Sequence, residues 1–317
     1  MLRKLARRLP RPARELIRSG LARYRSARYR LRERLSPTSL SQADVEAALR
    51  TSGLGEGDAV FLQAAMSAFG SFEDGPVTVV DALQAVVGPG GLIAMPAYSL
   101  TGPAIEHLAA DPVFDVRTTP SRMGAISEEL RRRPETLRSV HPTHSTSVRG
   151  PGAEEIVAGH ETASTPFGEG TPFPRIVERD ALQLFFGCGT GAITMYHSFE
   201  CTRVPPFPLD VFAPGRLFDA RCVDANGHEL HVRTLVHNPA LHPGRIDSNP
   251  QLQARFRDAI LAGGGKAVKL GRGEILAIRL KDMFEVFEQL VREGVTIYDR
   301  RLPDRPPAEA PQERVHA

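Results

Sequence analysis

Apolar residues along the first third of the chain group into blocks that predict a strand, a helix and a second strand. Residues 59–63, with the sequence AVFLQ, form a short apolar run typical of a buried strand, and residues 92–96 form another. Between them, residues 77–87 predict a helix, which follows a loop of mostly small side chains at residues 64–75. This order predicts a βαβ unit, whose first loop lies where such sheets bind ligands.

The alternation of strands and helices continues along the rest of the chain and predicts an α/β fold. Predicted helices cover residues 121–133, 175–178, the end of 190–201, 251–262 and 281–293. Predicted strands cover residues 183–188, a short segment after 263–266, and 274–279. Residues 205–236 alternate in polarity around Asn226-Gly227, a dipeptide typical of a tight antiparallel hairpin. Residues 98–120 and 150–174 show no periodic pattern and are predicted to be irregular.

The charge is distributed unevenly between the N-terminus and the rest of the chain. Residues 1–38 hold thirteen Arg and Lys against two Glu, a local balance of +11, which leaves −8 on the rest of a chain whose net charge is +3. An acidic body of this kind suits a cationic substrate and also leaves room for a polyphosphate at the basic end, so the charge alone does not choose between them.

Residues 1–36 predict a basic amphipathic helix after Pro10 and Pro12. Its apolar stripe consists of Ile17, Leu21, Tyr24, Leu31 and Leu35. Such a helix lies on an anionic membrane surface, packs on its own domain or contacts a second subunit of a homodimer, and the sequence leaves these alternatives open. Residues 301–317 form a proline-rich tail that we expect to be mobile.

Composition narrows the class of protein. The 317 residues, 41% of them hydrophobic, suffice for one large domain with a core. No apolar run reaches the eighteen or so residues of a membrane span, and the N-terminus lacks the pattern of a secretory signal. Cys188, Cys201 and Cys222 form no CxxC pair. We therefore expect a cytoplasmic protein, free or peripheral to the inner membrane surface, without a nucleic-acid partner.

Two stretches carry the residue types of a catalytic site. Residues 138–147, RSVHPTHSTS, place two histidines and several hydroxyl groups within ten positions. Residues 187–200, GCGTGAITMYHSFE, follow a predicted strand, and His197 and Glu200 are three apart, so they share one face of the helix that follows. A histidine beside a carboxylate suits general-base chemistry near neutral pH. We expect the two stretches to face each other across one active site.

Four motifs in this order resemble the aminoglycoside 3-N-acetyltransferase family of coenzyme A-dependent antibiotic N-acetyltransferases. Residues 55–99 resemble its opening strand, coenzyme loop and GP-x-G-T-L-x-M-P strand. Residues 138–156 resemble its HP-x-x-S-x-x-x-x-G segment, and residues 166–176 its P-x-G-x-G-S-P motif. Residues 187–200 resemble its glycine turn and T-x-x-H-x-x-E helix. The resemblance implies a single αβα-type domain with a central mixed sheet, over residues 39–300.

The resemblance also implies an activity and assigns roles to residues. The reaction is acetyl transfer from acetyl coenzyme A to a primary amine of an amino sugar, with no metal, in one direct step. His197 matches the general base, Glu200 the acid beside it, and Asp247 an acid of a later D-x-N segment. The positions that match coenzyme contacts are Gln63, Ala64, Met66, Ser67, Arg138, Ser139, His141 and Ser145.

One departure keeps a second class of function open. The family usually has a His-Ser pair after the first strand, whereas this chain has Gln63 to Ala65. A fold with an altered coenzyme loop could be a catalytically inactive binding or scaffold protein. The amine could belong to an aminoglycoside or to a biosynthetic amino sugar of a surface polysaccharide or secondary metabolite.

Other residues allow weaker readings of the chemistry. The spacing of His141 and His144, with His237, His242 or Asp247 as further ligands, would suit a metal-dependent hydrolase, but the HExxH pattern is missing. Cys201 lies one helical turn after His197 and could act as a nucleophile in a ping-pong reaction. A small buried hydrophobe is the simpler interpretation of that cysteine.

Overall fold

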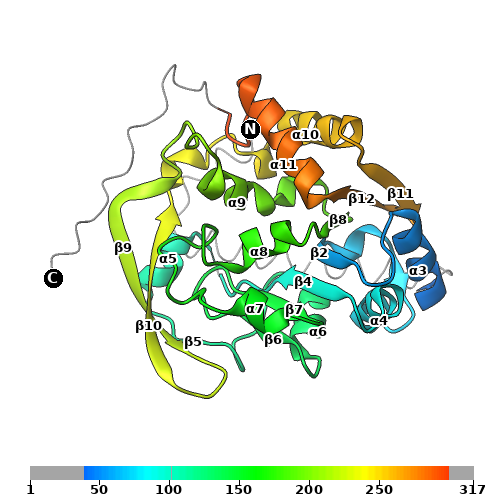
Figure 1. Cartoon of the computed structure of the whole chain (residues 1–317), viewed down its shortest axis with the longest axis horizontal. Helices are drawn as coiled ribbons and strands as arrows, with labels where there is room; N and C mark the ends of the chain where they lie inside the picture. Colours follow the sequence, from blue (N-terminus) through cyan, green and yellow to red (C-terminus); the bar gives the residue numbers. More distant parts are fainter. Residues whose placement is uncertain (1–38, 101, 300–317) are drawn as a thin grey trace, which may run out of the picture.

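The computed structural model describes residues 39–100 and 102–299 and places a seven-stranded sheet at their centre (Figure 1). The strand order is β11-β12-β8-β2-β4-β7-β6. The basic helix predicted for residues 1–36 and the proline-rich tail at 301–317 lie outside the described residues, so both stay predictions, as do the domain boundaries at 38 and 301.

The predicted βαβ unit is confirmed and forms the middle of the sheet. Strand β2 (Ala59–Ala64) leads through helix α4 (Pro76–Val87) to strand β4 (Leu92–Pro96), and the two strands are parallel. Strand β8 (Leu182–Phe186) runs parallel to β2 on its other side, with Gln63 opposite Phe185. The carboxyl ends of β2 and β8 therefore lie side by side, and so do the loops that follow them.

Antiparallel strands complete the sheet on both sides and make it mixed. Strands β12 (Gly273–Arg279) and β11 (Lys266–Leu270) continue it beyond β8. Strands β7 (Thr146–Arg149) and β6 (Leu137–Arg138) continue it beyond β4. The stretch at residues 138–147 thus contributes to the edge strand β6 and to its neighbour β7, which its hydroxyl-rich composition did not predict.

Helices cover both faces of the sheet, as the αβα prediction requires. Alternate residues of β2 point to opposite faces, so Val60 and Leu62 join one hydrophobic core and Phe61 the other. The first core is covered by α3 (Gln42–Thr51), α4 and α6 (Ala125–Arg132). The second core is covered by α7 (Ala153–Val157), α8 (Pro172–Glu178), α9 (Met195–Thr202), α10 (Pro250–Ala262) and α11 (Leu280–Arg292).

A smaller sheet lies beside the main one, at the left of Figure 1. Strands β9 (Phe212–Val223) and β10 (Glu229–His237) form the predicted antiparallel hairpin, which turns at Asn226-Gly227. Strand β5 (Phe114–Asp115) pairs with β9 in parallel. The remaining short strands, β1 (Ser39–Leu40) and β3 (Ser71–Phe72), pair with each other.

The prediction of irregular structure for residues 98–120 and 150–174 was wrong. The first segment contains β5 and helix α5 (Ala104–Ala109), and the second contains α7 and the start of α8. Elements of two to six residues complete too few periods to show a hydrophobic pattern, so periodicity does not detect them. The helix predicted from residue 121 begins at Ala125, after a turn in which Ser121 bonds Glu128.

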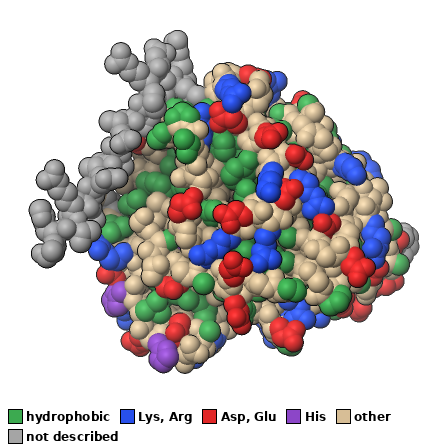
Figure 2. Space-filling view, viewed as in Figure 1, with side chains coloured by type: hydrophobic (Ala, Val, Ile, Leu, Met, Phe, Trp, Pro, Cys, Tyr) green, Lys and Arg blue, Asp and Glu red, His purple; other side chains and the backbone are tan. Residues whose placement is uncertain are grey.

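Two further findings concern helix hydropathy and surface charge. Among the described residues, no helix is long and apolar enough to cross a membrane. Lys and Arg side chains alternate with Asp and Glu over the face shown in Figure 2, so that face carries charges of both signs.

Candidate active site

The loops that leave β2 and β8 are bonded to each other and together place helix α9. Gly187, directly after β8, has a φ of +74°, and a Cβ there would lie 2.6 Å from the Phe69 ring. Only glycine fits this sharp turn. The Gln63 side chain, at the end of β2, donates to Thr194 Oγ1 at 2.8 Å and to the carbonyl of Ala192. These bonds fix the η2 turn (Thr190–Ala192) from which α9 begins.

His197 and Glu200 form a hydrogen-bonded pair on α9. His197 Nδ1 lies 2.8 Å from Glu200 Oε2, and the Glu200 side chain is fully buried. Since an ionised carboxylate only accepts, Nδ1 carries the proton and the lone pair of His197 is on Nε2. The His197 side chain is 12% exposed. His197 and Glu200 therefore share one helix face, as the three-residue spacing predicted. Their hydrogen bond leaves Nε2 of His197 as the basic nitrogen.

Burial and neighbouring groups set the charges of this pair. Desolvation, together with the nearby His237, lowers the pKa of His197 to about 4, although Glu200 acts in the opposite direction. Burial alone would raise the pKa of Glu200, but the charge and hydrogen bond of His197 and the proximity of His237 bring it to about 2. At neutral pH the pair is thus a neutral imidazole beside a carboxylate, the state that a general base requires.

A second histidine, His237, faces the same carboxylate. Its Nε2 lies 3.6 Å from Glu200 Oε2, longer than a hydrogen bond, and its ring centroid lies 4.2 Å from that of His197. His237 Nε2 and Glu200 Oε1 are both buried without a hydrogen-bond partner among the described residues. His237 ends β10, just after a register shift between Leu235 and His237 that redirects side chains.

Sequence reasoning named His237 only as an alternative metal ligand and missed its approach to Glu200. The only signal was its position at the end of a hairpin strand. The bulge that turns it inward leaves no mark in the alternation of polar and apolar residues.

Aromatic rings wall the histidines on one side. The Phe167 ring lies 5.1 Å from His197, 5.7 Å from His237 and 4.7 Å from His144, measured between centroids. Phe212 lies 5.4 Å from His237. His144, from the stretch at residues 138–147, contacts the same Phe167 ring as His197, so Phe167 lies between the two stretches. That they line one active site stays a prediction.

Asp247 lies on a separate turn, η4 (Ile246–Ser248), and pairs with an arginine. Its carboxylate accepts from Arg245 Nε at 2.9 Å, and its side chain is 50% exposed. The described interactions join Asp247 to Arg245 and not to His197 or Glu200. The positive charge of Arg245 contributes to lowering the pKa of His144 and His197, so this arginine lies close to the site.

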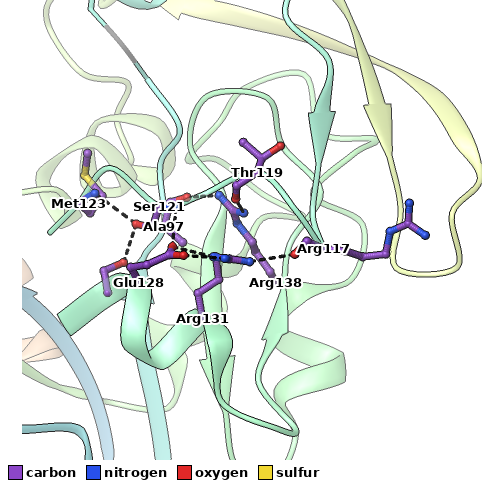
Figure 3. A network of polar contacts seen from close by, with 9 residues as sticks. Ala97, Arg117, Thr119, Ser121, Met123, Glu128, Arg131 and Arg138 are labelled. Carbon is purple, nitrogen blue, oxygen red and sulfur yellow. Dashed lines mark hydrogen bonds and ion pairs between the residues drawn. The ribbon is translucent and has the colours of Figure 1, made fainter. Parts of the chain in front are cut away.

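Arg138, predicted to line the coenzyme site, is buried in a polar network (Figure 3). Its guanidinium donates to Ser145 Oγ at 3.0 Å and to the carbonyls of Thr119 and Ala97, and it lies over the Phe114 ring. Burial, together with the charge of Arg131, lowers its pKa to about 9. Each of its three nitrogens is bonded to protein, so in this structure Arg138 fastens loops together.

The other predicted coenzyme residues of this stretch are also buried and bonded to protein. His141 Nδ1 accepts from the backbone N–H of His144 at 3.1 Å, and its Nε2 contacts Thr234 Oγ1 at the same distance. Ser139 Oγ contacts His160 Nδ1 at 2.8 Å, and Ser145 Oγ donates to the carbonyl of Ala97. A coenzyme contact by these groups would replace bonds already made, and that prediction stays untested.

The loop after β2 presents a different environment. Gln63 is buried, as described above, whereas Ala64 and Met66 are partly exposed and Ser67 is exposed. Met66 and Ser67 lie in a single 3-10 turn, η1 (Met66–Ala68). Of the residues predicted to contact coenzyme, these three are the ones that solvent reaches, and they lie beside the turn that leads to His197.

The structure also bears on the hypotheses of a cysteine nucleophile and of a metal site. Burial raises the pKa of the Cys201 thiol well above its usual range, and the charge of Glu200 raises it further. Such a thiol is not a thiolate at neutral pH, which disfavours a ping-pong reaction through it. Among the described residues, one group of three or more His, Cys, Asp and Glu side chains lies close enough to hold a metal, and it consists of His197, Glu200 and His237.

Comparison with known proteins identifies relatives of this chain. The family model described as aminoglycoside 3-N-acetyltransferase matches residues 61–292. Aminoglycoside N(3)-acetyltransferase VII of Streptomyces paromomycinus is 34% identical over 169 residues, 49% of this chain and 58% of that protein. Aminoglycoside N(3)-acetyltransferase IV of a Salmonella species is 30% identical over 52% of this chain and 60% of that protein. The matched region thus spans less than two thirds of either relative.

Solved structures share the fold over most of the chain. The aminoglycoside acetyltransferase AAC(3)-Xa has a TM-score of 0.69, with 23% identity over 86% of this chain and 98% of that one. A binary complex of AAC-IIIb with CoASH has a TM-score of 0.64, with 25% identity over 80% of this chain and 98% of that one. AAC-VIa bound to sisomicin has the same TM-score, with 25% identity over 80% of this chain and 99% of that one.

Proposed function

The chain belongs to the aminoglycoside 3-N-acetyltransferase family, and from this premise we propose that it transfers the acetyl group of acetyl coenzyme A to a primary amine of an amino sugar. The observation that carries the proposal is the His197–Glu200 pair on α9, inside the segment that the family model matches. The neighbours of this fold that hold CoASH and sisomicin support both halves of the reaction.

In the proposed mechanism His197 is the general base. The unprotonated amine attacks the thioester carbonyl, and His197 Nε2 accepts the proton that the nitrogen loses as the C–N bond forms. The Glu200 carboxylate, bonded to Nδ1–H, orients the imidazole and stabilises its cationic form. The C–S bond then breaks, and the coenzyme leaves as a thiol after taking that proton. Backbone N–H groups of the turn at residues 187–192 are suited to stabilise the oxyanion.

The state of Cys201 supports direct transfer of the acetyl group. The exposure of the loops around the site indicates where the coenzyme binds. The buried, protonated thiol of Cys201 disfavours an acetyl-enzyme on that residue. We assign direct coenzyme contact to the accessible loop with Ala64, Met66 and Ser67. In this proposal Arg138 and its buried neighbours shape the wall of the site. Asp247, half exposed, is assigned to the amine substrate's side, where it also balances Arg245.

The test is acetyl transfer by the full chain to a panel of amines. The panel contains aminoglycosides and simple amino sugars, and the measurement is amine-dependent release of free thiol, with the acetylated product identified by mass spectrometry. Coenzyme A at about a hundred times its dissociation constant should also raise the stability of the fold by about 2.7 kcal/mol. We expect both results.

Two outcomes would contradict the proposal and point to its alternatives. Binding of coenzyme A without turnover of any amine would favour a binding or scaffold protein. Hydrolysis that a chelator abolishes would favour a metal-dependent hydrolase. A homodimer and a membrane or subunit contact through residues 1–36 stay predictions that this experiment does not address.

A further inference from the structure

The base of the proposed reaction shares its surroundings with groups that suit a transition metal. One nitrogen from each of His197 and His237 and a carboxylate oxygen of Glu200 all lie within 4.8 Å of one another. Two histidines and a glutamate are a ligand set that proteins use for zinc, with one position left open. We propose that these three residues form an inhibitory site for Zn²⁺.

The spacing of the ligand atoms fits such an ion. Glu200 Oε2 lies 2.8 Å from His197 Nδ1 and 3.6 Å from His237 Nε2. Zinc bonds of about 2.0–2.1 Å in a tetrahedral arrangement separate neighbouring ligand atoms by about 3.3 Å, which lies between these two distances. A shift of a few tenths of an ångström in each side chain would bring the three groups to one ion.

Buried atoms of the same residues that lack a hydrogen-bond partner agree with this assignment. His237 Nε2, Glu200 Oε1 and the Tyr298 hydroxyl are buried without a hydrogen-bond partner among the described residues. Leaving such groups unpaired costs about 1–3 kcal/mol each, so a site of this kind favours an occupant that pairs with them. A divalent cation held by Glu200 Oε2 would bind His237 Nε2 directly. The histidine side chains are each 12% exposed, so an ion can reach them.

Zinc at this site would prevent His197 from acting as a base, although the imidazole would stay neutral. Neutral His197 carries its proton on Nδ1, which donates to Glu200. When Zn²⁺ takes the Nδ1 lone pair, that proton moves to Nε2, and the imidazole stays neutral. Nε2 is then an N–H donor and can no longer accept a proton from the amine. Metal binding and catalysis are therefore mutually exclusive at His197, a consequence that rests on the proposed function.

The binding test needs no activity. The full chain is dialysed against Zn²⁺ and its metal content measured, and Co²⁺ is used as a visible probe of a tetrahedral site. We expect one ion per chain at micromolar metal and at least a tenfold weaker affinity in His237→Gln. The matched control is His231→Gln. His231 is 64% exposed and pairs with Asp219 in the β9–β10 hairpin, where histidine side chains are visible at the lower left of Figure 2.

The results separate the site from adventitious binding. Equal zinc affinity in wild type and His237→Gln, or a loss of zinc in His231→Gln, would overturn the proposal. Thermal unfolding checks that His237→Gln is folded, and if it is not, Glu200→Gln takes its place with the same expected loss.

Inhibition is measured separately in wild type as the yield of acetylated amine, because free coenzyme thiol itself binds zinc. We expect reversal by a chelator. Zinc bound at the site without inhibition would overturn the inhibitory role. A chain without any acetyltransferase activity would leave the binding result standing and would refute the proposed function instead.

Discussion

At His197 a single hydrogen bond determines which ring nitrogen is available. Glu200 accepts from Nδ1–H, so Nε2 has the lone pair, and the buried setting keeps the ring neutral. His237, which faces the same carboxylate oxygen, adds a second imidazole whose charge opposes protonation of the first. The proton affinity of the base is therefore set by residues from two separate elements, α9 and β10.

The first prediction concerns the acid side of the pH–rate profile. His197 loses its function when Nε2 is protonated, so kcat/KM should fall as the pH drops through its lowered pKa of about 4, well below the usual value of about 6.5. In His237→Gln the repulsion is gone, and the acid limb should move to higher pH, whereas His231→Gln should leave it in place. A wild-type limb near pH 6.5 that neither variant shifts would refute this electrostatic account.

Arg138→Lys separates a structural role from a coenzyme-binding role. A lysine ammonium cannot reach the three acceptors, Ser145 Oγ and the carbonyls of Thr119 and Ala97, that the guanidinium joins. We expect a loss of about 1–3 kcal/mol in the free energy of unfolding, measured by denaturant titration, with the exposed Arg132→Lys within about 0.5 kcal/mol of wild type. Unchanged stability together with weaker coenzyme binding would instead make Arg138 a coenzyme ligand.

At the scale of elements, the site depends on the parallel pairing of β2 and β8. That pairing brings Gln63 beside the turn after β8, where its amide bonds Thr194 and Ala192 just before α9. The residue that departs from the family pattern at this position therefore connects two loops. The Gln63 amide therefore positions His197 indirectly, by holding the turn that precedes α9.

We expect Gln63→Met to lower kcat about ten- to a hundredfold while the KM for coenzyme changes little, because the turn before His197 loses its anchor. The variant keeps the length of the side chain and should lose about 1–3 kcal/mol of stability. Steady-state kinetics with both substrates makes the distinction. A raised coenzyme KM at unchanged kcat would show that Gln63 binds the coenzyme directly.

Elements with long, regular patterns could be predicted from the sequence, and so could residues brought together by helix spacing. The βαβ unit, the hairpin and the His197–Glu200 pair are of this kind. Residues joined by tertiary geometry could not be predicted. The bulge that turns His237 inward and the burial of Arg138 both depend on strands, β10 and β6, whose side-chain directions the polarity pattern does not show.

At the scale of the whole molecule, buried histidines connect the site to the stability of the fold. His141, His144 and His160 are buried, and the ring of His141 stacks on that of His160 at 4.4 Å. Burial lowers the pKa of all three below 6.5, that of His160 to about 3, and neighbouring imidazoles lower those of His141 and His144 further. All three rings are therefore neutral in the folded protein at neutral pH.

These histidines should make the protein acid-sensitive. Below about pH 6.5 these histidines are protonated in the unfolded chain but stay neutral in the folded chain. The free energy of unfolding therefore decreases by about 1.4 kcal/mol for each histidine with each unit that the pH is lowered. We expect a loss of several kcal/mol in the free energy of unfolding between pH 7 and pH 5, measured by urea titration. His160→Gln removes one of these histidines, so the free energy of unfolding should fall less steeply with decreasing pH, by about 1.4 kcal/mol per pH unit. A free energy that stays constant over this range would contradict the neutral, buried state of these rings.

The most direct test of the account is acetyl transfer by His197→Gln compared with wild type and with His231→Gln. Glutamine retains an amide that can donate to Glu200 but has no basic nitrogen. We expect kcat for acetylated amine to fall by about 10²–10⁴ in His197→Gln, with coenzyme binding and thermal stability close to wild type, and no change in His231→Gln. Turnover at the wild-type rate in a folded His197→Gln protein would show that another group is the base.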